Sequence, residues 1–466
     1  MSRKDFIIFA IIFAEGFIVL ASEVLIMRRL IPYVGNSVDV TSVIIGLVLL
    51  PLAAGYFLGG KYQDKNNNIR EKICKNFLIV GICLAIGFSF FTLELFFGIF
   101  HLLNINRIIQ VSIYMMIFFV YPVYLLAQTV PLISNYFTKQ NFTSLAGKIL
   151  FSSTFGSLLG SIITTLVIMN FFGVSYSVLI VLLMVLIVSI TLNKKLYDYN
   201  NLTILIFLAI YFTMDIGFKK EHSIYGDKLY STVQILPRDE GQSKILKINN
   251  PNSSNISSAK ITSDPDKRYS YVKHIEDNVI DIKAKRDHAQ DILIIGAGGF
   301  TIGHEDRFNR YHFVDIDKDL KPISEKSFLE QKLPNNHKFI HDSARSFLKS
   351  TKIKYDLILL DVYSNEYIIP FQLLTVEFFQ QIKDSLKRGG VAMLNIITWP
   401  DYADKYSIRV DNTLRTVFPN ITRQIVSEYS YQKSIKSNIL YIYKNIDYDN
   451  KIYTDNLNSA YLDVKN

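Results

Sequence analysis

The first half of the chain is dominated by apolar runs that are long enough to cross a lipid bilayer. A membrane-spanning helix needs about 20 predominantly apolar residues, and runs near that length occur at 6–27, 43–58, 77–97, 108–130, 145–172, 174–192 and 202–218. The first run follows Arg3 and Lys4 as in a signal peptide, but it lacks a small-residue cleavage site and continues into Arg28-Arg29. We therefore expect it to remain in the mature protein. The pattern predicts a helical membrane domain of about seven spans over residues 1–218.

A few polar side chains interrupt these spans, namely Glu15, Glu23, Glu94, Gln128 and Asp215. A carboxylate at membrane depth is costly, so it indicates either an ion pair or a transport pathway. The pairing interpretation is favoured: Glu23 lies close in sequence to Arg28 and Arg29, and we expect Glu15 and Asp215 to be near enough to helix ends to reach water. A transport pathway stays open as the alternative.

The net charge and the two cysteines argue against a nucleic-acid-binding surface, a cysteine metal site and a disulfide framework. The chain carries a net charge of +9, but the first 218 residues hold 14 Lys/Arg and 9 Asp/Glu, which leaves 36 and 32 for the remainder. An excess of four positive charges over residues 219–466 is too small to indicate a nucleic-acid-binding surface. Cys74 and Cys83 have neither metal-ligand spacing nor the number needed for a disulfide framework. We expect them to be packing residues, and we expect no bound metal and no nucleic-acid partner.

The second half shows the order of signals of a doubly wound α/β sheet. An apolar strand at 292–295 leads directly into Gly296-Ala297-Gly298-Gly299, where glycines let the backbone approach a ligand closely. A second strand, 311–314, ends in Asp315, which lies 19 residues after Gly296. An acid at that interval can accept both hydroxyl groups of a ribose. A nucleotide site at the carboxyl ends of these strands is therefore predicted.

Two further strand ends distinguish among nucleotides. The third glycine of a dinucleotide fingerprint is Thr301 here, which weakens the case for NAD. His341-Asp342-Ser343 follows a short strand and places a carboxylate where it could accept from an adenine amino group. The apolar strand 355–360 delivers Asp361 at its end, and ligands of open α/β sheets bind outside such ends.

These motifs, in this order and spacing, resemble the spermidine synthase family. The resemblance extends over nearly the whole chain and rests on these segments: Ile292 through Asp317, Asp342, Tyr355 to Asp361, Pro370 to Phe379, Gly389-Gly390-Val391 with Asn395, Ser223 to Gly226, and the surroundings of Leu246 and Tyr269. The N-terminal half is similar to membrane-fused bacterial members in Ala21-Ser22-Glu23, Arg28-Arg29, Pro32-Tyr33, Gly35-Asn36-Ser37 and Gly55 to Gly60.

The resemblance implies a fold class and its division into domains. We expect a multi-span α-helical membrane domain (1–218), a small β-rich N-terminal lid of the soluble part (219–285), an α/β Rossmann-like domain of the S-adenosylmethionine (AdoMet)-dependent methyltransferase type (286–445) and a C-terminal tail (446–466).

The resemblance also implies an activity, transfer of an aminopropyl group from decarboxylated AdoMet to a diamine or a related small amine. Carried over by position, the turn at Gly296 and Gly298 would face the nucleoside. Asp315 would hold the ribose, and Asp342 with Ser343 the adenine. Asp361 would be the catalytic acid that faces the amine. We further expect Tyr225 and Tyr363 to line the substrate site.

Three positions depart from the family pattern. Family members that make spermidine carry an aspartate where this chain has Gly299, a second aspartate where it has Ser364, and a His-Glu pair where it has Ser270-Tyr271. Each missing acid would have contributed about 1.5 to 3 kcal/mol as a charged hydrogen bond to a cationic substrate. Glu305, Glu366 and Asp317 are candidates to compensate. Methyl or other alkyl transfer from intact AdoMet therefore stays open. A membrane transporter or sensor whose soluble domain binds the nucleotide without catalysing a reaction also stays open.

Membrane orientation is constrained by two opposing arguments. Most basic residues of the first half crowd one set of connections (Arg3, Lys4, Lys61, Lys65, Arg70, Lys72, Lys75, Lys139, Lys148, Lys194 and Lys195), which the positive-inside rule places in the cytoplasm. Seven spans would then put the soluble domain outside. A domain that consumes an intracellular nucleotide should instead face the cytoplasm, and we expect a multi-pass inner-membrane protein with a cytoplasmic soluble domain. The lipid bilayer is an expected partner, and a homo-oligomer is compatible with the sequence.

Overall fold

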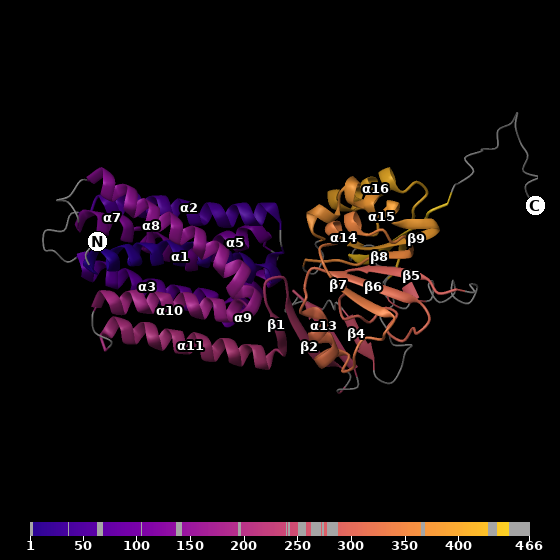
Figure 1. Ribbon diagram of the computed structural model, residues 1–466, viewed down its shortest axis with the longest axis horizontal. Helices are drawn as coiled ribbons and strands as arrows, with labels where there is room; N and C mark the ends of the chain where they lie inside the picture. Colours follow the sequence, from indigo (N-terminus) through magenta and orange to yellow (C-terminus); the bar gives the residue numbers. More distant parts are fainter. Residues whose placement is uncertain are drawn as a thin grey trace, which may run out of the picture.

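The computed structural model consists of a helical bundle and an α/β part that follow one another along its longest axis (Figure 1). It describes residues 3–35, 37–62, 69–103, 105–136, 142–193, 197–238, 240, 243–249, 258–261, 272, 275–276, 288–364, 369–426 and 436–446. The bundle ends at Glu221, where α11 ends, and the first strand begins at Ile224.

The bundle is built from long apolar helices. They are α1 (Arg3–Val34), α2 (Val38–Gly60), α3 (Ile69–Phe88), α4 (Phe90–Leu102), α5 (Arg107–Met115), α6 (Tyr121–Ala127), α7 (Thr129–Tyr136), α8 (Phe142–Ile163), α9 (Asn170–Phe172), α10 (Val174–Asn193) and α11 (Tyr199–Glu221), with π-helical turns at Met116–Val120 and Thr164–Met169. Within the described residues, six helical segments are long and apolar enough to cross a membrane. A seventh arises if α3 and α4, bent by 60° at their break, count as one span.

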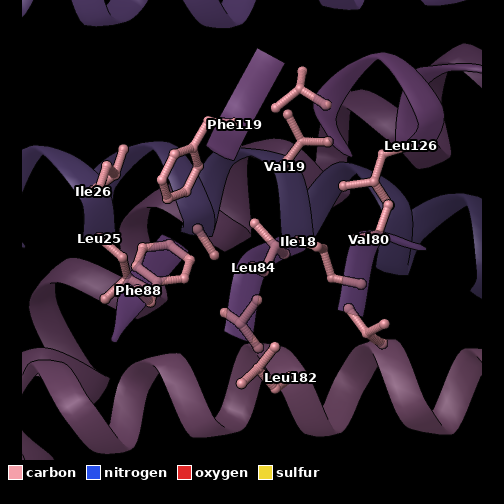
Figure 2. Close-up of a cluster of buried hydrophobic side chains, with 14 of the residues drawn as sticks. Ile18, Val19, Leu25, Ile26, Val80, Leu84, Phe88, Phe119, Leu126 and Leu182 are labelled. Atoms are coloured by element: carbon pink, nitrogen blue, oxygen red, sulfur yellow. The ribbon is translucent and has the colours of Figure 1, made fainter. Parts of the chain in front are cut away.

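The bundle core is formed around α1. Ile18 and Leu25 of this helix are buried together with Leu84 and Phe88 of α3 and Leu182 of α10 (Figure 2). Large apolar side chains such as Leu50, Phe57 and Phe151 remain exposed on the bundle surface. Helices that are apolar on all sides need an apolar surrounding as well as each other. The pattern therefore fits helices that face lipid on their outer sides.

Glycines bring α1 and α8 into close contact. A Cβ atom built on Gly156 would lie 2.1 Å from the carbonyl oxygen of Phe13, and one on Gly16 would lie 2.1 Å from that of Ser153. Such small residues allow helix backbones to approach in a membrane, where packing and polar contacts replace the hydrophobic effect.

The polar groups of the bundle are arranged differently from the sequence expectation. Arg29 pairs with Asp215 at 3.0 Å and with Asp227 at 3.2 Å, and not with Glu23. Asp215 is only 2% exposed, so the expectation that it reaches water was wrong. Glu15 is also fully buried and accepts a hydrogen bond from Ser153 Oγ at 3.0 Å. Burial next to an arginine explains Asp215, because a buried charge must be paired.

The α/β part is centred on a seven-stranded sheet with the order β10-β11-β9-β8-β5-β6-β7. Its strands are β5 (Asp291–Ile295), β6 (Arg310–Asp315), β7 (His337–His341), β8 (Tyr355–Leu360), β9 (Leu386–Thr398), β10 (Thr422–Ile425) and β11 (Ser437–Lys444). Strands β5 to β9 pair in parallel, whereas β11 is antiparallel to both of its neighbours. The order reverses at β5, and its carboxyl end is the position where open α/β sheets bind ligands.

Side chains alternate between the two faces of the sheet. Leu293 and Ile295 belong to the core on one face, and Ile292 and Ile294 to the core on the other, as the period of two in a strand requires. The first face is covered by α14 (Ala344–Ser350), α15 (Val376–Asp384) and α16 (Lys405–Val417); the second carries α13 (Leu320–Ile323).

A second, four-stranded antiparallel sheet joins the bundle to the α/β part. Its order is β1 (Ile224–Asp227), β2 (Thr232–Arg238), β3 (Ser243–Ile248), β4 (Ser258–Ile261). Val233, Ile235 and Leu246 of this small sheet contribute to the core on the second face of the large sheet. The expected fold class, apolar helices followed by a Rossmann-like domain with a small β-rich region, is thereby confirmed.

Candidate functional site

The carboxyl ends of four parallel strands meet at one edge of the large sheet. Backbone hydrogen bonds tie these ends together: Gly296 N donates to Val314 O at 3.0 Å, Asp361 N to Ile295 O at 2.9 Å, and Asp342 N to Asp315 O at 3.1 Å. The structure therefore brings together the Gly turn, Asp315, Asp342 and Asp361, as the sequence predicts from the ends of their strands.

The turn after β5 requires glycine at its first position. Gly296 has a φ angle of +95°, and a Cβ atom there would lie 2.1 Å from the carbonyl oxygen of Asp361. Gly298 also has a positive φ, +50°. This conformation is accessible to glycine without the steric penalty that other residues meet. The glycines thus let two neighbouring strand ends approach each other at the centre of the site.

Asp315 is held under this turn by backbone donors. Its Oδ2 atom accepts from Ala297 N and its Oδ1 atom from Asp317 N, both at 2.9 Å. Burial nevertheless raises the pKa of Asp315 to about 6, and the two amide donors act against that rise. Asp315 as a whole residue is half-buried. Its carboxylate is oriented by the Gly turn, and each of its two oxygens keeps a lone pair that a ligand could use.

Asp361 is oriented from the neighbouring strand β9. Its Oδ1 atom accepts from Asn395 Nδ2 at 2.9 Å, and burial raises its pKa to about 6 against this hydrogen bond. Asn395 is 2% exposed, and its own Oδ1 atom has no hydrogen-bond partner among the described residues. A carboxylate with a pKa near neutrality suits a proton acceptor, and the arrangement makes Asp361 the best candidate for that role.

Asp342 and Ser343 occupy the end of β7. Asp342 Oδ1 accepts from Ser343 N at 2.7 Å, and Ser343 Oγ accepts from Ser346 N at 3.2 Å as the N-cap of α14. The local turn orients both side chains at the sheet edge. Their predicted contact with an adenine stays a prediction.

The two predicted substrate tyrosines lie in different settings. Tyr363 donates to Asn395 O at 2.8 Å and accepts from Ile397 N at 2.9 Å, so its hydroxyl braces the loop after Asp361 against β9. Tyr225 lies in the small sheet, and its side chain is 53% exposed. Neither hydroxyl needs a substrate to explain its position.

Two of the three positions that depart from the family pattern make backbone contacts within the described residues. Gly299 is buried, and its carbonyl accepts from Ser324 Oγ at 2.8 Å. The carbonyl of Ser364 accepts from Asn249 Nδ2 at 3.1 Å. Asp317, a candidate to compensate for the missing acids, is 4% exposed and bonded to Ser231. Ser270-Tyr271 and Glu366 lie outside the described residues.

Asn395 is a site residue that the sequence did not assign a role. It was visible only as part of the run Gly389-Gly390-Val391 with Asn395, and nothing local shows that its amide meets a carboxylate 34 positions earlier. Within the described part of the chain, no group of three or more His, Cys, Asp or Glu side chains is arranged to hold a metal.

Comparison with known proteins shows what the second half of the chain is similar to. Residues 274–447 match the model "Spermine/spermidine synthase domain". A "Polyamine aminopropyltransferase" of Vibrio vulnificus is 34% identical over 135 residues, which cover 27% of this chain and 43% of that protein. A "Probable polyamine aminopropyl transferase" of Bifidobacterium longum is 27% identical over 150 residues, 31% of this chain and 32% of that protein. The chain thus matches less than half the length of either curated relative.

Among solved structures, a probable spermidine synthase from Corynebacterium glutamicum covers 48% of this chain and 81% of its own, at 22% identity and a TM-score of 0.40.

Proposed function

We propose that this protein is a membrane-anchored transferase that moves an aminopropyl group from decarboxylated AdoMet to a diamine or a related amine; the match of residues 274–447 to the spermine/spermidine synthase domain supports the proposal. The observation that carries the proposal is the pair of half-buried aspartates, Asp315 at the end of β6 and Asp361 after β8, which lie on either side of the Gly296 turn at the end of β5. One acid is placed to hold a nucleoside and the other to receive a proton.

The reaction needs a neutral amine in line with a carbon that is bonded to sulfonium. The amine nitrogen forms a bond to that carbon, the carbon–sulfur bond breaks with its electrons going to sulfur, and the new ammonium loses a proton. Asp361 accepts this proton, because its carboxylate is ionised above about pH 6 and is oriented by Asn395. Positioning supplies much of the remaining acceleration in a reaction of this kind.

A second candidate, methyl or other alkyl transfer from intact AdoMet, is favoured by one observation. The buried Gly299 puts no carboxylate where family members that make spermidine hold the donor's amino group. Without that carboxylate, the donor's own carboxyl group meets no repulsion there.

Side-by-side binding separates the two candidates. Calorimetry on the full-length protein in detergent should show tighter binding of decarboxylated AdoMet than of AdoMet. Preference for intact AdoMet would replace aminopropyl transfer by alkyl transfer, and binding of neither would refute both.

Turnover provides the second test. Asp361→Asn should bind the nucleotide as the wild type does but release no 5′-methylthioadenosine when an amine is added. Asp401→Asn removes a charge from an exposed loop and serves as the matched control. Full turnover by Asp361→Asn would remove this acid from the mechanism.

We further propose that the soluble domain faces the cytoplasm, because nucleotide donors are made there. Figure 1 places the α/β part at the end of the bundle away from the start of α1. The basic connections at that other end would by the positive-inside rule also face the cytoplasm, so the two arguments oppose each other. Labelling of a single cysteine introduced at exposed Lys352, in intact cells with an impermeant reagent, decides between them: labelling would refute the cytoplasmic placement.

A further inference from the structure

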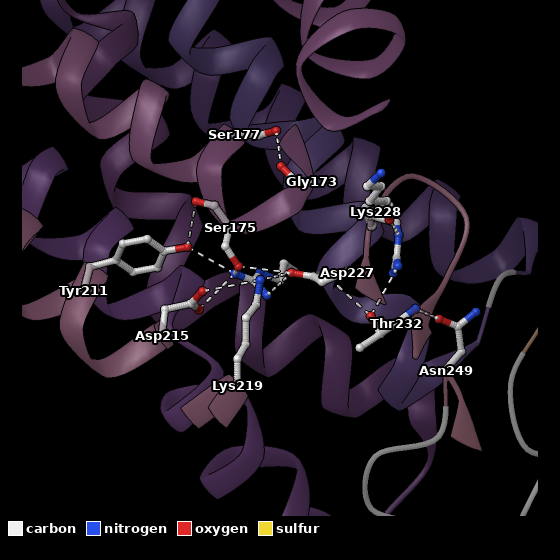
Figure 3. A network of polar contacts seen from close by, with 12 residues as sticks. Gly173, Ser175, Ser177, Tyr211, Asp215, Lys219, Asp227, Lys228, Thr232 and Asn249 are labelled. Atoms are coloured by element: carbon white, nitrogen blue, oxygen red, sulfur yellow. Dashed lines mark hydrogen bonds and ion pairs between the residues drawn. The ribbon is translucent and has the colours of Figure 1, made fainter. Parts of the chain in front are cut away.

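A buried ion network lies where the helical bundle meets the small sheet. Arg29 of α1 contacts Asp215 of α11 and Asp227 of β1. Lys219 contacts Asp227 at 2.9 Å, and Figure 3 shows Asp215, Lys219 and Asp227 close together. Burial alone would raise the pKa of Asp227, but Lys219, Arg29 and Arg28 together hold it well below the usual value. The junction between the two parts is therefore ionic and buried.

Arg28 extends this contact to the turn between β1 and β2, which we call the junction hairpin (residues 227–232). Its Nε atom donates to Lys228 O at 2.6 Å, and its Nη2 atom donates to Thr232 Oγ1 at 3.2 Å. Asp227 and Thr232 are paired across the hairpin. One guanidinium of α1 thus contacts the turn and the start of β2 together, and its several donors in a fixed geometry suit such a double contact.

The opposite side of the junction hairpin contacts the loop that follows Asp315. Lys228 Nζ pairs with Asp319 at 2.8 Å, and the Ser231 hydroxyl is bonded to Asp317. Asp317 N in turn donates to Asp315 Oδ1. Burial raises the pKa of Asp317, and the Ser231 hydroxyl and the nearby Arg28 charge oppose this rise. Arg28 therefore acts on this loop both through the hairpin and directly through its charge.

The hairpin also reaches the loop that follows Asp361. Thr232 N donates to Asn249 Oδ1 at 2.8 Å, and Asn249 Nδ2 donates to Ser364 O at 3.1 Å. The same short segment is thus linked directly to the loop after Asp315 and, through Asn249, to the loop after Asp361.

We infer that Arg28, a residue of the first apolar helix, is a positioning residue for the nucleotide and acceptor sites, acting through the junction hairpin. The inference rests on the proposed function for what the site binds. The contacts themselves make the helical bundle a part of the site and not only an anchor. Removing the guanidinium takes one hydrogen bond from each of Lys228 and Thr232 and so weakens the support of the loop that carries Asp317 and Asp319.

Amide hydrogen exchange on the full-length protein in detergent, without nucleotide, tests the coupling. In Arg28→Gln the amides of Asp317 and Asp319 should exchange at least about tenfold faster, because about one net hydrogen bond or more is lost from their support. The amides of β11, on the far side of the sheet, should not change. Lys220→Gln removes a neighbouring exposed charge and should behave as the wild type. Unchanged exchange at Asp317 and Asp319 in Arg28→Gln would overturn the inference, as would an equal rise in β11.

Two further variants, Ser231→Ala and Arg28→Lys, test the same coupling independently. Ser231→Ala removes the hydroxyl that is bonded to Asp317 and leaves the bundle unchanged, so it serves as the test variant if Arg28→Gln does not fold. Amide exchange at Asp319 should be faster in Ser231→Ala than in the wild type, and an unchanged rate overturns the inference. Arg28→Lys keeps the charge but not the fork, and should rescue exchange only in part. Nucleotide affinity is then measured separately. A wild type that binds no nucleotide refutes the proposed function, whereas the exchange result alone decides the coupling.

Discussion

Asp361→Asn should make the folded protein more stable while abolishing turnover. Burial raises the pKa of Asp361 from 3.8 to about 6, so the folded state holds its proton more tightly than the unfolded state. Stability is therefore lost as pH rises from about 4 to about 6, and the whole penalty is present above pH 6. Two pKa units correspond to about 3 kcal/mol. Asparagine keeps an oxygen that can accept from Asn395 Nδ2, so it removes the charge and little else.

Thermal unfolding at two pH values measures this effect. At pH 7.5 the variant should melt roughly 6–12 °C above the wild type, if each kcal/mol shifts the midpoint by about 2–4 °C. At pH 4 both side chains are neutral and the midpoints should coincide. Asp401→Asn, on an exposed loop, should change neither value by more than about 1–2 °C, since such surface substitutions lie within about ±0.5 kcal/mol. A gain of the same size at pH 4, or none at pH 7.5, would refute the argument from burial.

Three other substitutions probe separate parts of the molecule. Asp315→Ala removes the proposed ribose acceptor and should weaken nucleotide binding by calorimetry roughly tenfold to a hundredfold, the value of a charged hydrogen bond; unchanged affinity contradicts the ribose role. Asp227→Asn leaves Arg29 with one buried carboxylate and should lower the unfolding free energy by about 3 kcal/mol, seen as a lower midpoint in thermal unfolding; an unchanged midpoint argues against the ionic junction. Gly156→Ala places a methyl group 2.1 Å from a backbone oxygen of α1 and should destabilise the bundle by about 1–3 kcal/mol. Gly147→Ala, where nothing lies within 4 Å, is its control, and equal midpoints for the two variants would contradict close helix packing.

The acids at the strand ends could be predicted because their signals are local. A run of apolar residues followed by Asp315 or Asp361 indicates a buried strand and its exit, and parallel strands deliver their carboxyl ends to one edge. The same holds for the membrane helices, whose length and apolarity are set within each run. Even the break between α3 and α4 leaves the seven expected runs recognisable as six helices and one bent pair.

The partners of the polar side chains were decided only by the tertiary structure. Arg29 looked like a partner for Glu23, six positions away, but it meets Asp215 and Asp227, which follow 186 and 198 positions later. Asn395 likewise finds Asp361 only because β9 lies beside β8 in the sheet. The length of an apolar run and the alternation of side chains along a strand are properties of one continuous segment, so both can be read from the sequence alone. Which buried charges meet depends on how distant segments pack, because a buried ion is stabilised by whatever opposite charge the folded chain brings within a few ångströms.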